Sequence, residues 1–175
     1  MIEITKKLTE TYTLRGEQSL WAKINLEYGE KSVNVMINSD YGSYAYYWGS
    51  TGENPKSFLC NISKHYTMLK FAGENIYEAD WEKRLERIYK EIEYKLKEKE
   101  ITKEEAIIAK KEAKKIINYG TSEDIYFKEM MENEYLEKIF YDFEIIPEDI
   151  KIKSTVDMFW ENIWIPFINE LKKEI

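Results

Sequence analysis

Along the first third of the chain, side chains of similar polarity recur at every second position. Leu20, Ala22, Ile24 and Leu26, for example, are separated by residues of the opposite face. This period of two is typical of half-buried strands, and glycine-containing turns separate the runs. The predicted strands cover residues 9–14, 20–27, 33–38 and 44–48. They predict an antiparallel meander of three or four strands, with one face against a core and one face in water.

From Asn54 onward the apolar residues recur with the period of a helix. Pro55 is favourable at the first position of a helix, and Gly73 is a typical helix end. The run 102–105 (Thr-Lys-Glu-Glu) is a capping-box pattern that opens a helix. Pro166 lies inside the last apolar pattern and is expected to kink or split that helix. The predicted helices cover residues 54–72, 79–97, 102–118, 123–140 and 155–171, with Gly120 as one stop and a short extended piece at 143–146.

These two patterns predict an α+β fold, with an N-terminal antiparallel sheet of three to four strands followed by a helical C-terminal half. We expect residues 1–75 to form the sheet with the first helix. We expect residues 76–175 to form a helical extension that packs as one unit with the sheet.

Composition excludes several classes of protein. The chain has 175 residues, a net charge of −7, one cysteine and one histidine. These counts exclude internal disulfides, Cys-rich zinc sites and any catalytic site that needs two histidines. The acidic balance disfavours generic phosphate binding. No apolar run is long enough to span a membrane and no signal peptide is visible, so we expect a cytoplasmic protein in a bacterial host cell with no membrane partner.

No group of residues predicts catalysis. Cys60 and His65 diverge by roughly 140° around a helix, so a nucleophilic pair is not expected. Glu129, Glu132 and Glu137 on one helix are better explained as a solvated face than as metal ligands. The sequence therefore predicts no enzyme, no cofactor and no metal site, and an enzyme that uses carboxylates ranks last among the hypotheses.

The segment from Asp40 to Trp48 is unusually rich in aromatic residues. In a strand, Tyr44, Tyr46 and Trp48 point one way and Tyr47 points the other way. These rings can fill the core between sheet and helices, anchor a protein interface or stack on nucleic-acid bases. The acidic balance of the chain disfavours the last of these.

Acidic residues concentrate between residues 121 and 150. Ten acidic residues stand there against Lys128 and Lys138, which gives this segment a net charge of −8. Such a surface can serve solubility, or it can steer the protein onto a basic partner such as the nucleic-acid groove of another protein.

The order of motifs in residues 20–75 resembles small accessory proteins encoded by phages and prophages. The resemblance rests on the runs 39–49 (Ser-Asp-Tyr-Gly-Ser-Tyr-Ala-Tyr-Tyr-Trp-Gly), 57–59 (Ser-Phe-Leu) and 66–73 (Tyr-Thr-Met-Leu-Lys-Phe-Ala-Gly). It carries no agreed activity, so it transfers no catalytic residue. Accessory proteins of this size and charge include inhibitors of host defence, among them the anti-CRISPR proteins, which are often acidic and occupy the nucleic-acid surface of a Cas effector.

The leading hypothesis is therefore a phage-encoded, non-enzymatic interaction protein, most concretely an anti-CRISPR inhibitor of a Cas nuclease or its guide-RNA complex. The alternative is a phage nucleic-acid-binding protein that uses the aromatic strand as a stacking platform. The oligomeric state stays open. The residues predicted to contact a partner are Tyr41, Tyr44, Tyr46, Trp48, Glu129, Glu132, Glu134 and Glu137.

Overall fold

The structure is a computed structural model, and it describes residues 2–118, 122–142 and 146–175. An N-terminal four-stranded antiparallel sheet is followed by a helical C-terminal half. The predicted α+β class is confirmed. Gly120 and most of the extended piece predicted at 143–146 lie outside the described residues.

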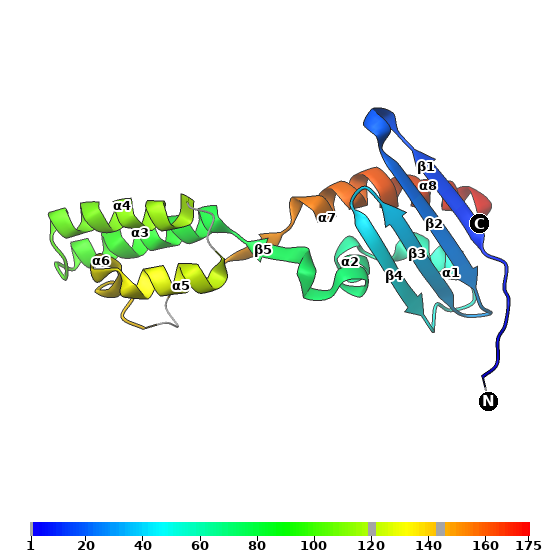
Figure 1. Cartoon of the computed structure of the whole chain (residues 1–175), viewed down its shortest axis with the longest axis horizontal. Coiled ribbons are helices and arrows are strands. Elements are labelled where there is room, and N and C mark those ends of the chain that lie inside the picture. The colour runs from blue at the N-terminus through cyan, green and yellow to red at the C-terminus, as the bar shows by residue number, and fades with distance from the viewer. Residues whose placement is uncertain (1, 119–121, 143–145) are drawn as a thin grey trace. The chain divides into compact units, whose positions relative to one another are not determined.

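Two compact units make up the chain (Figure 1). The sheet unit is Met1–Tyr77 with Ile152–Ile175, and the helical unit is Glu78–Lys151. The division predicted at residue 75 placed residues 152–175 in the helical extension. They belong to the sheet unit because their buried side chains, such as Phe159 and Phe167, are part of its core. The packing of the helical residues against the sheet as one unit stays a prediction.

The sheet is a simple meander in which each strand pairs with the next. Its register places Ile24 on β2 between Tyr12 of β1 and Ile37 of β3. Two strands, β1 and β4, therefore form the edges of this sheet. The strands are β1 (Glu10–Arg15), β2 (Trp21–Tyr28), β3 (Val33–Ser39) and β4 (Gly42–Trp48).

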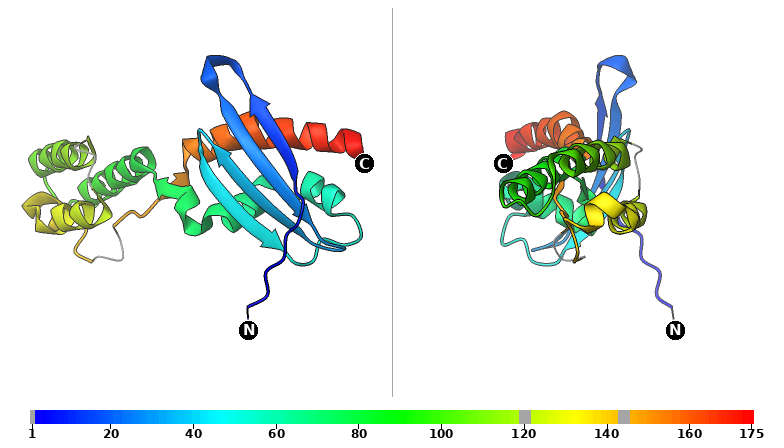
Figure 2. Two further views of the ribbon diagram at one scale, coloured as in Figure 1. Left: turned by 45° about the vertical axis from the view of Figure 1, so that its right-hand side comes forward. Right: turned by 90° about the vertical axis from the view of Figure 1, so that its left-hand side faces the viewer.

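The helices of the sheet unit lie on one face of the sheet (Figures 1 and 2). Ala22, Ile24 and Leu26 of β2 are fully buried there, because they occupy the inward positions of the alternation. The opposite face carries the outward residues. The elements on the covered side are α1 (Pro55–Asn61), α2 (Lys64–Ala72), η2 (Gly73–Ile76), α7 (Ser154–Phe159), η4 (Trp160–Trp164), α8 (Ile165–Leu171) and η5 (Lys172–Glu174).

Two of the predicted helices differ in the structure. The helix predicted at 54–72 is divided at Ile62, whose backbone is extended, and Ser63 caps the second part through its side chain. The helix around Pro166 continues, but a π-helical turn, η4, ends at Trp164, two residues before the proline. Proline has no N–H to donate to the preceding turn and its ring crowds that turn, so the wider π-turn accommodates it.

In its described residues, the helical unit packs four helices around a second core. Ala109 and Ala113 of α4 are fully buried, and their small side chains allow α3 and α4 to approach closely. Asn133 interrupts the helix predicted at 123–140, because its side chain caps a new helix. The elements are α3 (Trp81–Lys97), α4 (Lys103–Asn118), α5 (Glu123–Glu132) and α6 (Glu134–Glu137).

The chain crosses between the units twice. The crossing segments pair as a two-stranded sheet of β5 (Tyr77–Ala79) and β6 (Ile150–Ile152). Neither strand is predicted from the sequence, because three residues are too few to show an alternation.

Candidate interaction surfaces

Three of the four aromatic residues predicted to contact a partner point inward from β4. Trp48 is only 4% exposed. The ring of Tyr44 lies 4.7 Å from that of Phe159 and 5.6 Å from that of Phe71, measured between centroids. Tyr46 packs edge-on against Trp48 at 4.8 Å. Trp48 is part of the core of the sheet unit, and the half-buried rings of Tyr44 and Tyr46 pack against that core. A stacking platform made of these three rings therefore does not face the solvent.

Tyr41, the fourth predicted aromatic residue, is half-buried in the turn between β3 and β4. Its hydroxyl accepts a hydrogen bond from the side-chain amide of Asn162, at 3.0 Å. Its carbonyl accepts one from the hydroxyl of Tyr44, at 2.9 Å. Tyr41 thus ties the turn to the C-terminal helical stretch.

The outward face of the sheet carries two exposed aromatic residues. Tyr47 is 62% exposed and Trp21 is 44% exposed. Neither residue is in the predicted site. The signal that could have found them is the alternation, in which Trp21 lies between Leu20 and Ala22, and Tyr47 between Tyr46 and Trp48. The outward residues of the four strands are Thr11, Thr13, Arg15, Trp21, Lys23, Asn25, Glu27, Asn34, Met36, Asn38, Ser43, Ala45 and Tyr47.

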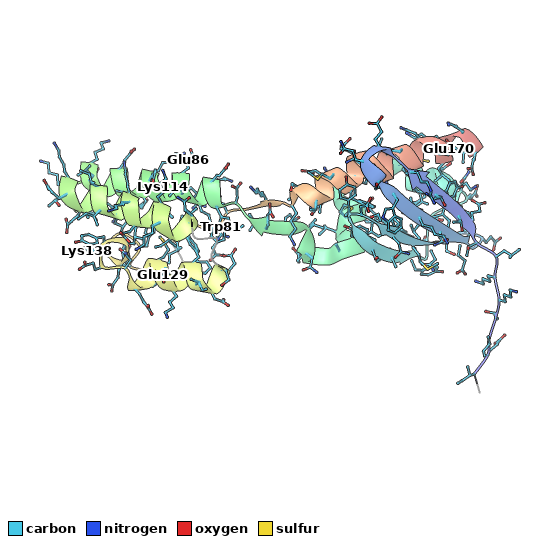
Figure 3. The ribbon with its side chains drawn as sticks, turned by 45° about the horizontal axis from the view of Figure 1, so that its top comes forward. Trp81, Glu86, Lys114, Glu129, Lys138 and Glu170 are labelled. Carbon is cyan, nitrogen blue, oxygen red and sulfur yellow. The ribbon has the colours of Figure 1, made fainter. Side chains whose placement is uncertain are left out.

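The four predicted glutamates are all exposed, and they lie on two consecutive helices of the helical unit. Figure 3 labels one of them, Glu129. Glu129 and Glu132 are on α5, whereas Glu134 and Glu137 are on α6. Asn133 places the second pair, since its side chain accepts hydrogen bonds from the backbone N–H groups of Tyr135 and Leu136.

A shallow groove of about 320 Å³ runs along α5, and Glu132 is the one predicted glutamate that lines it. Phe127 and Met131 form its apolar part, and both are half-buried. Asp124, Lys128 and Glu132 form its polar part, with Lys128 and Glu132 3.9 Å apart. We name this groove together with Glu129, Glu134 and Glu137 the α5–α6 surface.

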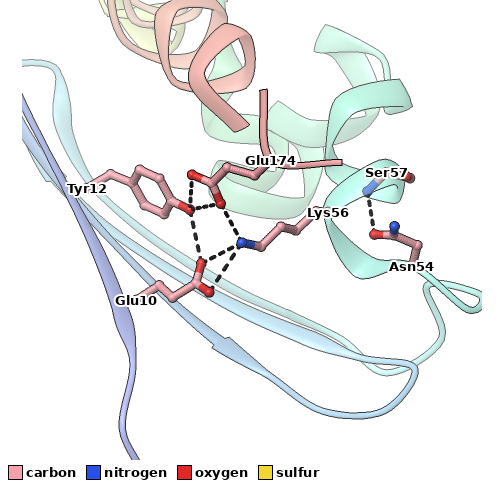
Figure 4. Close-up of polar contacts among 6 residues, drawn as sticks. All are labelled: Glu10, Tyr12, Asn54, Lys56, Ser57 and Glu174. Carbon is pink, nitrogen blue, oxygen red and sulfur yellow. Dashed lines mark hydrogen bonds and ion pairs between the residues drawn. The ribbon is translucent and has the colours of Figure 1, made fainter. Parts of the chain in front are cut away.

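A polar cluster joins three elements of the sheet unit (Figure 4). Lys56 Nζ of α1 lies 2.9 Å from a carboxylate oxygen of Glu10 on β1 and 2.5 Å from one of Glu174 on η5. The hydroxyl of Tyr12 donates to both carboxylates, at 3.0 Å. Burial opposes the charge of Lys56, but its bonds to Glu174 and Glu10 outweigh this and raise its pKa. The same bond from Lys56 lowers the pKa of Glu174.

Cys60 and His65 have different surroundings. His65 Nε2 lies 2.7 Å from the hydroxyl of Tyr77. Cys60 is half-buried, and this burial raises the pKa of its thiol, which keeps it protonated. Among residues 2–118, 122–142 and 146–175, the structure contains no group of three or more His, Cys, Asp or Glu side chains that could hold a metal ion.

These units and surfaces define a two-unit α+β protein. The chain matches a phage family over residues 2–174, and it belongs to that phage family. The resemblance to phage-encoded proteins is therefore confirmed. Neither curated proteins nor solved structures gave a match. Within the described part of the chain, no helix has both the length and the apolar character that crossing a membrane requires.

Proposed function

We propose that this phage protein is a non-enzymatic interaction protein that binds another protein through the α5–α6 surface. The observation that carries the proposal is the groove lined by Phe127 and Met131, which Asp124 and Glu132 border. An apolar patch with a charged rim is the usual anatomy of a protein interface. Tyr44, Tyr46 and Trp48 are not part of the proposed surface, because their rings pack inside the sheet unit.

The chemistry of this surface specifies its partner. Glu129, Glu134 and Glu137 favour a basic surface, and their field speeds the approach of such a surface at low ionic strength. The groove favours one apolar side chain among the basic residues of that partner. The partner is therefore a basic protein surface with an apolar anchor.

The most concrete form of the proposal is an anti-CRISPR inhibitor. A Cas effector offers a basic surface of this kind where it binds its guide RNA and target, and the acids of the α5–α6 surface would occupy it in place of phosphates. Membership of a phage family and the net charge of −7 support this form.

Affinity capture tests the proposal. The tagged protein is exposed to a bacterial lysate with an active CRISPR system, with and without nuclease treatment. A Cas protein retained in both arms supports direct protein contact. Retention only without nuclease treatment would favour nucleic-acid binding and contradict the proposal.

Charge reversal shows whether the captured partner binds at the α5–α6 surface. Glu129→Lys with Glu132→Lys should weaken binding of the captured partner by about tenfold or more, and Met131→Glu should do the same by placing a charge in the groove. The matched control is Glu86→Lys with Glu98→Lys, which makes the same change of charge on exposed residues near α3. Equal binding by both charge-reversed proteins would exclude the α5–α6 surface.

A further inference from the structure

The segment before β1 carries exposed apolar side chains. Ile2, Ile4 and Leu8 are 90%, 91% and 93% exposed, and residues 2–9 form no helix or strand. We name residues 2–9 the arm, and Figure 1 shows it leading away from the sheet from the start of β1. The three apolar residues occupy even positions, as do the inward residues Tyr12 and Leu14 of β1. The arm therefore has the pattern of a strand that continues β1 but has no neighbouring strand.

The free edge of β1 lies in a groove of about 640 Å³. All residues from Thr11 to Gly16 line this groove, and Asn162, Pro166, Phe167 and Glu170 form the opposite wall. The backbone N–H of Gly16 donates to the carbonyl of Leu20, at 2.8 Å, where β1 turns into β2. Antiparallel pairs alternate between bonded and non-bonded positions, so the backbone groups of Thr11, Thr13 and Arg15 point away from β2, toward the groove.

We propose that the arm of a second copy of this chain occupies this groove, antiparallel to β1, and that the exchange is reciprocal. In the register that we propose, Glu3 lies opposite Arg15 of the second copy, and Thr5 lies opposite Thr13. Thr9 then lies opposite Thr9 on the two-fold axis. The two sheets join edge to edge, and this removes two exposed strand edges.

The side chains of the arm fit this register. Glu3 and Arg15 have opposite charges and come to lie on the same outward face, and neither forms an ion pair within the described part of the chain. On the inward face, Ile4 lies opposite Leu14, beside the wall formed by Phe167. Lys6 lies opposite Tyr12, whose hydroxyl is bonded to the carboxylates of Glu10 and Glu174.

The register is also the reason for choosing a second copy as the occupant. A two-fold interface requires that residue i contacts residue j and that j contacts i. Pairing Glu3 with Arg15 in one direction generates the same pair in the other direction, with Thr9 at the centre. Both arms then bury their exposed isoleucines, and both grooves are filled.

The test measures the oligomeric state of the full chain by analytical ultracentrifugation over a range of concentrations. We expect a dimer. Glu3→Lys and Arg15→Glu should each weaken it about tenfold, because each reversal places like charges opposite one another in two symmetric pairs. The double variant Glu3→Lys with Arg15→Glu should recover the dimer. An equimolar mixture of the two single variants should also dimerise, since both cross-strand pairs are then attractive.

Controls separate this effect from misfolding. All the reversed residues are exposed, so circular dichroism and thermal unfolding should match the unaltered protein. Lys23→Glu, on the outward face of β2 and outside the proposed pairing, should leave the dimer unchanged. A full chain that stays monomeric at its highest soluble concentration would overturn the proposal. A dimer that neither single reversal weakens would also overturn it.

Discussion

The guanidinium of Arg84 on α3 donates two hydrogen bonds to the carboxylate of Glu123 on α5, at 2.7 and 2.9 Å. Arg84 is 1% exposed, whereas the side chain of Glu123 is 48% exposed. The Nε of Arg84 donates to the carbonyl of Asp149, at 3.0 Å, and its guanidinium lies over the rings of Trp81 and Tyr126. This one buried cation therefore joins α3, α5 and the segment that leads into β6.

Removing the Glu123 carboxylate alone should lower the stability of the helical unit more than removing both charges of the Arg84–Glu123 pair. Glu123→Ala leaves a buried guanidinium without its carboxylate partner. We expect this to destabilise the helical unit by about 2–3 kcal/mol. This value is below that for a fully buried pair because Glu123 is partly exposed. The double variant Glu123→Ala with Arg84→Met should be more stable than Glu123→Ala alone, because the unpaired charge is gone. Urea denaturation of the two variants and of Arg84→Met checks this.

The matched control is the exposed pair of Lys90 and Glu86, which are 2.6 Å apart on α3. Glu86→Ala should change stability by no more than about 0.5 kcal/mol, because exposed pairs contribute little. A Glu123→Ala protein as stable as the Glu86→Ala protein would show that the Arg84–Glu123 pair contributes nothing to the helical unit.

The cluster around Lys56 should make the stability of the sheet unit depend on pH. Lys56→Met removes the cation between Glu10 and Glu174 and should cost about 1 kcal/mol near neutral pH. Glu174 has a lowered pKa in the folded state, so its contribution is present above its ordinary value of 4.5 and is lost as the pH falls through the folded value. Lys56 has a raised pKa, so its contribution is present below its ordinary value of 10.5 and is lost as the pH rises through the folded value.

The difference in stability between the Lys56→Met protein and the unaltered protein should therefore be largest between these limits and shrink at both extremes. Denaturation curves at a series of pH values measure it. A difference that stays constant from acid to alkaline pH would mean that the aliphatic stem of Lys56, and not its charge, stabilises the sheet unit.

The capping box that the sequence predicts is present at the start of α4, and its contribution to stability can be measured. Thr102 Oγ1 accepts from the N–H of Glu105 at 3.2 Å, and the Glu105 carboxylate accepts from the N–H of Thr102 at 2.9 Å. Thr102→Ala should destabilise the helical unit by about 1 kcal/mol in thermal or urea unfolding. Thr155→Ala, at an exposed position one residue inside α7, should have a smaller effect, because Lys153 holds the cap position of that helix. Equal losses would contradict the capping role of Thr102.

The same capping box should make the stability of the helical unit depend on pH in the acidic range. Hydrogen bonds from Lys138 and Thr102 lower the pKa of Glu105 to about 2. Its stabilising contribution is therefore present above its ordinary value of 4.5 and is lost as the pH falls toward 2. Glu105→Gln should flatten this part of the stability profile, and an unchanged profile would contradict the assignment.

The sequence predicts the sheet and the capping box well because both depend on neighbours in the chain. The alternation placed Ile24 and Leu26 on one face of their strand and turned Tyr47 away from Tyr46 and Trp48, and the structure agrees. The break at Ile62 is invisible to a 3.6-residue pattern, because the apolar positions continue through it. The return of residues 152–175 to the sheet unit is also invisible, since it depends on contacts between residues more than a hundred positions apart.

The candidate site shows the same limit. The exposure of Glu129 and Glu137 follows from charge alone, and the structure agrees. The aromatic strand could not be assigned from its composition, because a ring that fills a core and a ring that binds a partner are the same residue type. Only the helices packed on β4 show that Tyr44 belongs to the core, as its contacts with Phe71 and Phe159 demonstrate.

Two adjacent residues of β4 should differ in their contribution to stability, because one is buried and the other is exposed. Trp48 is 4% exposed and Tyr47 is 62% exposed. Trp48→Ala should destabilise the sheet unit by about 3–5 kcal/mol, because it leaves a cavity against Phe58 and Phe71. Tyr47→Ala should change stability by no more than about 0.5 kcal/mol. Thermal unfolding of the two variants measures the contrast.

Binding assays on the same two variants extend the argument to function. If the α5–α6 surface alone holds the partner, Tyr47→Ala should leave binding unchanged. Trp48→Ala should then reduce binding only at temperatures where the sheet unit itself unfolds. Loss of binding by the fully folded Tyr47→Ala protein would instead assign the outward face of the sheet to the interface, and the aromatic strand would take part through the one tyrosine that its alternation turns toward the solvent.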